Sequence, residues 1–365
     1  MTLKYFKTIS FLLSVLFTLS LSSQNEVEKT NDLIKKFSKK DTVKRKSKLL
    51  PLAIPITEPA VGFGIIVGVM HNITKKDSLE KPDMVAGIAG ITTNGTWLVG
   101  GGYLGYWKQD NLRFTGFTGY GNIIMDYYGL GSENPIQFDQ EAFFLSQELL
   151  FRLGESNFFI GGKYQLSTIY INPTFFPERS IDLDELFKTV NSGVSIVTEF
   201  DNLNHFLSPT EGYKIELSYD QNLEVLGSRR DWGTLNLNIN MYWPVNEWWV
   251  PALRIESHVA TGSPPFYAYP YVSLRGIPAL RYQGKTSLVV ETEQLINFAP
   301  RWGVVGFTGI GTAIKSVEQN DNEVVWNAGS GIRFLASRSM GVKLGVDIAK
   351  GPEEWAYYFT VGSAW

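Results

Sequence analysis

The stretch GTLNLNINMYW at residues 233–243 alternates apolar and polar side chains over its whole length. The apolar set is Leu235, Leu237, Ile239, Met241 and Trp243. Asparagine dominates the positions between them. Because successive side chains of an extended chain point to opposite faces, this period of two predicts a β-strand. One face of that strand is apolar and the other is suited to water.

The same pattern continues on both sides of this stretch. Segments 213–220, 324–335 and 340–349 alternate in the same way, and strand-like segments separated by turn residues follow one another from Lys48 onward. A soluble β-sandwich also has one apolar and one polar face. A run of strands and turns over about 300 residues without a helical segment favours a membrane barrel instead.

The lengths of the connections give this barrel a direction. About sixteen strands are expected, and the first, at 50–57, is weak because Pro51 and Pro55 lack a backbone donor and suit an edge or seam. With a periplasmic C-terminus, the longest connections fall on the outer side, near 125–139, 171–190, 221–230, 261–285 and 314–323. The tight turns fall on the periplasmic side, at 108–110, 153–155, 244–247, 299–301 and 336–339.

Tryptophan is sorted by the same assignment. The residues at the periplasmic strand ends are Trp107, Trp243, Trp248, Trp249, Trp302 and Trp365. Tryptophan gathers at membrane–water interfaces, where its ring is half in lipid and half in water. The predicted fold class is therefore an all-β transmembrane antiparallel β-barrel, with these residues forming one interfacial girdle.

The N-terminal part has a different composition. Lys4 and Lys7 precede an apolar run that ends near Leu21, which predicts a signal peptide over residues 1–23. Residues 24–48 are charged and have no hydrophobic period, so a disordered periplasmic arm is expected there, with the barrel over 49–365. The basic side chains of the arm can lie against anionic lipid headgroups, and a plain solvated spacer is an equal alternative.

The overall composition excludes several classes of function. The net charge of −3 gives no basic field for nucleic acid, and the absence of cysteine excludes disulfides and thiolate metal sites. The three histidines, His71, His205 and His258, lie in different segments, and no nucleophile elbow or phosphate loop is present. No cofactor and no enzymatic activity are predicted.

Four short motifs lie in the second half of the chain. The first is Leu274, Arg275 and Gly276, followed by Ile277, in a predicted outer loop. It resembles the VRGF/VRGY loop signature of the BamA/TamA superfamily of outer-membrane assembly factors and secretion transporters, which prefers an aromatic residue at the position of Ile277. Residues 200–217 resemble its periplasmic turn. The matching positions of that turn are Asp201, Pro209, Thr210, Gly212 and Tyr213.

The other two motifs follow in the family's order. Phe307 and Gly311 keep two positions of an F-x-D-x-G motif, whose aspartate is replaced by Gly309. The stretch YYFTVGSAW resembles a C-terminal signal strand. The residues that carry this last resemblance are Phe359, Gly362 and Trp365. The family's docking domains, called POTRA domains, do not fit into the short segment before the first strand.

The resemblance implies contacts for the opening loop. In the family this loop folds back into the lumen, and its arginine contacts acidic residues of the wall. The implied partners of Arg275 are Glu293 and, as a second candidate, Glu291. Gly309 removes the usual aspartate, which predicts either a more loosely held loop or replacement of that partner by Asp347 and Glu256. A solvated basic surface loop is the alternative.

The resemblance also implies a function. A barrel of this family is expected in the bacterial outer membrane, with its N-terminal arm and C-terminus in the periplasm. It would insert or translocate proteins or lipids. Its expected partners are outer-membrane lipids, unfolded barrel or lipid clients, and the barrel assembly machinery for its own insertion. A passive porin-like channel for small solutes is the alternative function.

Overall fold

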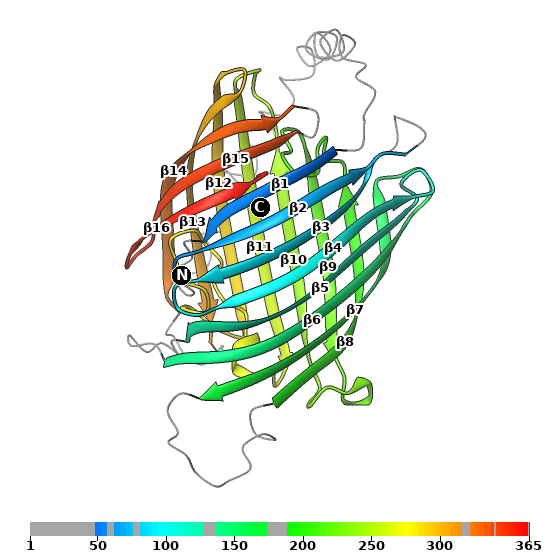
Figure 1. The fold of residues 1–365 in the computed structure, drawn as a ribbon. Helices are drawn as coiled ribbons and strands as arrows, with labels where there is room; N and C mark the ends of the chain where they lie inside the picture. Colours follow the sequence, from blue (N-terminus) through cyan, green and yellow to red (C-terminus); the bar gives the residue numbers. More distant parts are fainter. Residues whose placement is uncertain are drawn as a thin grey trace, which may run out of the picture. The chain divides into compact units, whose positions relative to one another are not determined.

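One curved antiparallel sheet contains all the strands that the structure describes (Figure 1). The computed structural model describes residues 48–56, 62–75, 81–127, 136–173, 188–315, 322–338, 341–363 and 365. The predicted signal peptide and all of the predicted arm except Lys48 lie outside these residues. Within them, sixteen strands follow one another in the sheet in chain order.

The strand boundaries agree with the alternating segments of the sequence. The strands are β1 (Lys48–Ile56), β2 (Gly64–Ile73), β3 (Asp83–Thr92), β4 (Trp97–Trp107), β5 (Leu112–Tyr127), β6 (Ile136–Arg152), β7 (Phe158–Pro173), β8 (Lys188–Asp201), β9 (Gly212–Asn222), β10 (Trp232–Tyr242), β11 (Trp249–Gly262), β12 (Thr286–Ala299), β13 (Trp302–Ile314), β14 (Val324–Ser337), β15 (Val342–Lys350) and β16 (Trp355–Val361). Two 3-10 turns, η1 (Glu224–Leu226) and η2 (Phe266–Ala268), interrupt the connections. None of the described helices is long and apolar enough to cross a bilayer.

Strand β10 shows how the alternation builds the two surfaces. In the register with β11, Asn236 is opposite His258, Asn238 is opposite Glu256, and Asn240 is opposite Arg254. These polar pairs face inward, while Leu235 on the outer face is exposed. Large apolar side chains are exposed in the same alternating way on most other strands. The predicted all-β membrane barrel of about sixteen strands is confirmed.

Four short turns and the long loop 263–285 lie at opposite ends of the barrel, although the short connections 93–96 and 351–354 lie at the same end as the long loop. The short turns 108–111, 153–157, 243–248 and 300–301 all lie at one end, because they follow even-numbered strands. The loop 263–285 follows β11 and lies at the other end. Trp107, Trp243, Trp248 and Trp302 are exposed at the end with the short turns. That this end faces the periplasm stays a prediction.

The two edge strands of the sheet, β1 and β16, form a seam. They lie side by side, but within the described residues no ladder of backbone hydrogen bonds joins them (Figure 1). Strand β1 contains Pro51 and Pro55, and proline cannot donate to a ladder. The prediction of an edge position for this strand is confirmed.

The expected signal strand ends earlier than predicted. Strand β16 stops at Val361, and Gly362 adopts a left-handed conformation with φ of 96° that ends the strand. Its N–H still donates to the carbonyl of Lys343 at 2.7 Å. The next described residues turn inward, so the prediction that Trp365 belongs to the outer girdle is wrong. Phe359 remains on the outer face and is exposed.

Candidate functional site at the lumen loop

The loop 263–285 packs on the inner face of the wall. Val272, Leu274 and Ile277 of the loop are buried against inward-facing residues of β12, β13 and β14. These wall residues are Val289, Ala313 and Val325. The folding of this loop into the lumen, rather than into solvent, is therefore as expected.

The same loop also reaches a distant part of the wall. Phe266 packs on Phe138 of β6, with their ring centroids 5.4 Å apart. Asn191 of β8 donates a hydrogen bond to the hydroxyl of Tyr267 at 3.0 Å. Strands β6 and β8 are several strands away from β12 in the sheet. The loop therefore crosses the lumen and is fixed to the wall on both sides.

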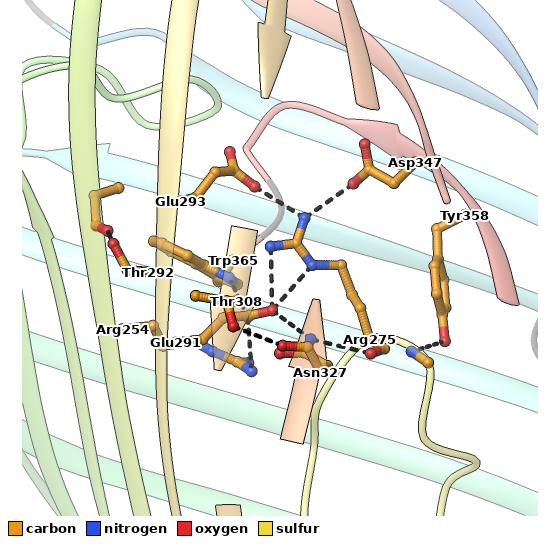
Figure 2. A network of polar contacts seen from close by, with 12 residues as sticks. Arg254, Arg275, Glu291, Thr292, Glu293, Thr308, Asn327, Asp347, Tyr358 and Trp365 are labelled. Atoms are coloured by element: carbon orange, nitrogen blue, oxygen red, sulfur yellow. Dashed lines mark hydrogen bonds and ion pairs between the residues drawn. The ribbon is translucent and has the colours of Figure 1, made fainter. Parts of the chain in front are cut away.

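Arg275 is the charged centre of the loop (Figure 2). Its Nη1 donates to Oε2 of Glu293 and to Oδ2 of Asp347, each at 2.9 Å. Its Nε donates to Oε1 of Glu291 at 3.2 Å, and the guanidinium lies 3.4 Å from the ring centroid of Phe307. The two implied partners and one of the two suggested replacements are all present. Glu256 is not a partner of Arg275.

The charges around Arg275 compensate one another. The side chains of Glu291 and Asp347 are fully buried, and a buried carboxylate is tolerated only when it is paired. Arg254 pairs with Glu291 at 3.2 Å and with Glu256 at 3.3 Å, and Arg333 pairs with Asp347. Burial lowers the pKa of Arg275, but the neighbouring carboxylates outweigh it and raise that pKa above its usual value. Arg275 therefore stays charged.

Asn327 completes this network, although it was not among the site residues that the sequence predicted. Its Nδ2 donates to the carbonyl of Arg275 at 3.0 Å and to Oε1 of Glu291 at 2.9 Å. A Cβ at Gly309 would lie 2.9 Å from both Asn327 Oδ1 and Leu274 Cδ2. Gly309 therefore makes room for the loop. The only signal in the sequence was the place of Asn327 on a predicted polar face.

The loop is also tied to the β15–β16 hairpin, next to the seam. The N–H of Gly276 donates to the hydroxyl of Tyr358 at 2.8 Å, and Arg281 pairs with Glu353 at 2.7 Å. The hydroxyl of Tyr282 donates to Glu353 at 2.8 Å. The Arg281 hydrogen bonds lower the pKa of Glu353, and burial together with Glu353 raises the pKa of Tyr282 to about 12.

Residues 106–276 match the Omp85 superfamily domain. The chain carries an Omp85 superfamily domain. This match confirms the resemblance that the motifs indicated. A search of the curated proteins gives no match.

Solved structures of Omp85-type barrels share the fold. BamA from Haemophilus ducreyi lacking POTRA domains 1–3 is similar with a TM-score of 0.57 and 14% identity, over 87% of this chain and 70% of that one. CdiB from Acinetobacter baumannii has a TM-score of 0.60 and 11% identity, over 86% and 59% of the chains. CdiB from Escherichia coli has a TM-score of 0.59 and 10% identity, over 86% and 61%. The chain thus spans about three fifths of either CdiB chain. The chain therefore has the β-barrel fold of these outer-membrane proteins, and its residues 106–276 match the Omp85 superfamily domain.

The turn motif lies between β8 and β9 and makes contacts of its own. Asp201 accepts a hydrogen bond from Arg113 at 2.6 Å. Pro209 is buried, and Gly212 has a φ of 98°. Thr210 Oγ1 accepts a hydrogen bond from Asn204 at 2.8 Å, and Tyr213 stacks on Phe200 at the outer face. These contacts fix the turn between the ends of β8 and β9.

Phe307 and Gly311, the two kept positions of the F-x-D-x-G motif, contribute to the loop site. Phe307 lies under the guanidinium of Arg275. A Cβ at Gly311 would lie 2.6 Å from Val272, so glycine at this position permits the close approach of the loop.

His258 accepts or donates a hydrogen bond with Asn236 at 2.8 Å, within a polar lumen wall. Among the described residues, no cluster of histidine and acidic side chains is arranged to hold a metal.

Proposed function

We propose that this Omp85-type barrel assists the insertion or translocation of proteins or lipids at the outer membrane. The observation that carries the proposal is the loop 263–285, which crosses the lumen and is fixed through Arg275. A loop in this position obstructs diffusion of solutes through the barrel. The seam between β1 and β16, which no ladder of backbone hydrogen bonds closes, offers a second route, from the lumen sideways into lipid.

The contacts of the loop link the obstructed lumen to the seam between β1 and β16. Gly276, Arg281 and Tyr282 hold the β15–β16 hairpin, and β16 is one edge of the seam. A client strand or lipid that enters through the seam would pass beside this hairpin. Outer-membrane lipids and unfolded barrel proteins are therefore the proposed partners, and the barrel assembly machinery would insert this chain itself.

An insertion assay tests this function. The purified barrel is reconstituted into lipid vesicles, and folding of a urea-unfolded small outer-membrane barrel is followed by its change in gel mobility. The control is the variant Ala53→Cys/Tyr357→Cys, whose two seam positions are exposed and are joined by a short bismaleimide. We expect faster folding with the open seam than with the joined seam or with empty vesicles. Equal rates in all three would contradict the proposal.

A porin-like channel is the second candidate. It is favoured by the charged inner wall of β7 to β9, where Lys163 pairs with Asp220 and Lys214 pairs with Glu199. Single-channel recording in planar bilayers separates the two functions. A small, unsteady conductance is expected for a lumen crossed by the loop, whereas a large and steady conductance would support the channel.

A further inference from the structure

The turn between β8 and β9, residues 202–211, has an ordered base. Asn204 Oδ1 accepts hydrogen bonds from the N–H groups of Thr210 and Glu211 at 3.0 and 3.3 Å. Asn202 Oδ1 accepts one from the N–H of Tyr213 at 2.6 Å. These bonds hold the two arms of the turn together. The tip, residues 205–209, is thereby presented as a fixed unit.

The tip reaches the C-terminal side of the seam. The N–H of Ser363, just after β16, donates to the carbonyl of Leu207 at 2.7 Å. The N–H of Lys343 in β15 donates to Oγ of Ser208 at 3.3 Å. A Cβ at Gly341 would lie 3.1 Å from Nδ1 of His205, so the imidazole also lies close to this side.

The same tip contacts the N-terminal side of the seam. Leu207 belongs to an apolar cluster inside the barrel. This cluster contains Val342 and Val361 of β15 and β16, and Leu50, Met70, Met84, Ala86 and Leu104 of β1 to β4. Its members thus come from both sides of the unladdered seam. Removal of these apolar side chains from water is favourable, so the cluster can hold two edges that share no backbone ladder.

We propose that residues 202–211 form a strap that crosses the lumen mouth and holds the two edges of the sheet together. Strands β8 and β9 are halfway along the sheet from both edges, so the turn must cross the mouth to reach them. Ser208 and the Leu207 carbonyl supply hydrogen bonds to the β16 side, and the Leu207 side chain joins both sides. Separation of β1 from β16 then requires release of the strap. This role holds whatever the barrel transports.

Distance measurement across the seam tests the strap. Because the chain has no cysteine, spin labels can be placed uniquely at Ala53→Cys in β1 and Tyr357→Cys in β16. Double electron–electron resonance in lipid nanodiscs then gives the distribution of distances between the labels. The strap variant is Leu207→Ser/Ser208→Ala. The matched control is Phe206→Ser, because Phe206 lies on the same turn and is 53% exposed.

We expect a broader distribution with longer distances in the strap variant, and a parent-like distribution in the control. The N–H groups of Lys343 and Ser363 should exchange with deuterium about tenfold faster in the strap variant, as for loss of one or two hydrogen bonds. An unchanged distribution, or equal broadening in variant and control, overturns it. If the double variant lacks the compact gel band of a folded barrel, Ser208→Ala alone is measured by the same criteria.

Discussion

The indole nitrogen of Trp365 donates a hydrogen bond to Oε2 of Glu291 at 2.8 Å (Figure 2). Glu291 is fully buried and also pairs with Arg275 of the loop, Arg254 of β11 and Asn327 of β14. One carboxylate therefore joins the loop, the wall and the segment after β16. The ring of Trp365 packs on Tyr242, whose hydroxyl donates to the Trp365 carbonyl at 3.0 Å.

Replacement of this indole tests its contribution. Trp365→Phe keeps a ring but removes the N–H donor, so we expect a loss of about 1 kcal/mol in the free energy of unfolding. Trp365→Ala should cost more, because the packing on Tyr242 is lost as well. Urea unfolding in detergent micelles, followed by circular dichroism, measures both. Trp302→Phe is the control, since Trp302 is exposed on the outer face; an equal loss there would argue against the lumen contact.

Substitution of Arg275 should release the loop. Arg275→Ala leaves buried carboxylates with fewer partners, and breaking such pairs typically costs about 3–5 kcal/mol. We expect a larger single-channel conductance than in the parent barrel. Arg275→Lys should be intermediate, because an ammonium group cannot reproduce the planar contacts to Glu291 and Glu293. A parent-like conductance in both variants would show that Arg275 does not hold the loop.

Gly276 is expected to tolerate no side chain. It has a φ of 87°, and a Cβ would lie 2.7 Å from the backbone nitrogen of Gly351. Gly276→Ala should therefore push the loop away from the β15–β16 hairpin and weaken the bond to Tyr358. Protease digestion of the folded barrel should cut within 263–285 faster than in the parent. Gly306→Ala is the matched control, because a Cβ there meets nothing within 4 Å.

The attachment of the loop to Glu353 should weaken in acid. The folded pKa of Glu353 is lowered from its usual 4.5, chiefly by hydrogen bonds from Arg281. The attachment is therefore complete above about pH 4.5 and is lost as the pH falls through the lower, folded pKa. We expect hydrogen exchange at Tyr282 to accelerate over this range. Glu353→Gln should have fast exchange at every pH; a parent-like pH dependence in that variant would assign the effect to another group.

The lumen site could be predicted only in part. The resemblance to the BamA/TamA superfamily implied the contacts of Arg275 with Glu293 and Glu291, and a buried guanidinium needs such carboxylates. Asn327 and Arg254 were not assigned to the site, since neither belongs to a recognisable motif. Their contacts depend on the register between β11, β12, β13 and β14, which brings distant segments to one place.

The membrane barrel could be predicted from the sequence, because alternating strands follow one another over about 300 residues without a helical segment, which is unusual for a soluble sandwich. Segment 233–243 and its neighbours carry that information locally. The positions of Trp365 and Leu207 follow only from the tertiary structure. Tryptophan is a typical girdle residue, but the turn at Gly362 directs Trp365 to the buried carboxylate of Glu291, which accepts its N–H. Leu207 reaches the seam only because the sheet curves and brings its edges opposite β8 and β9.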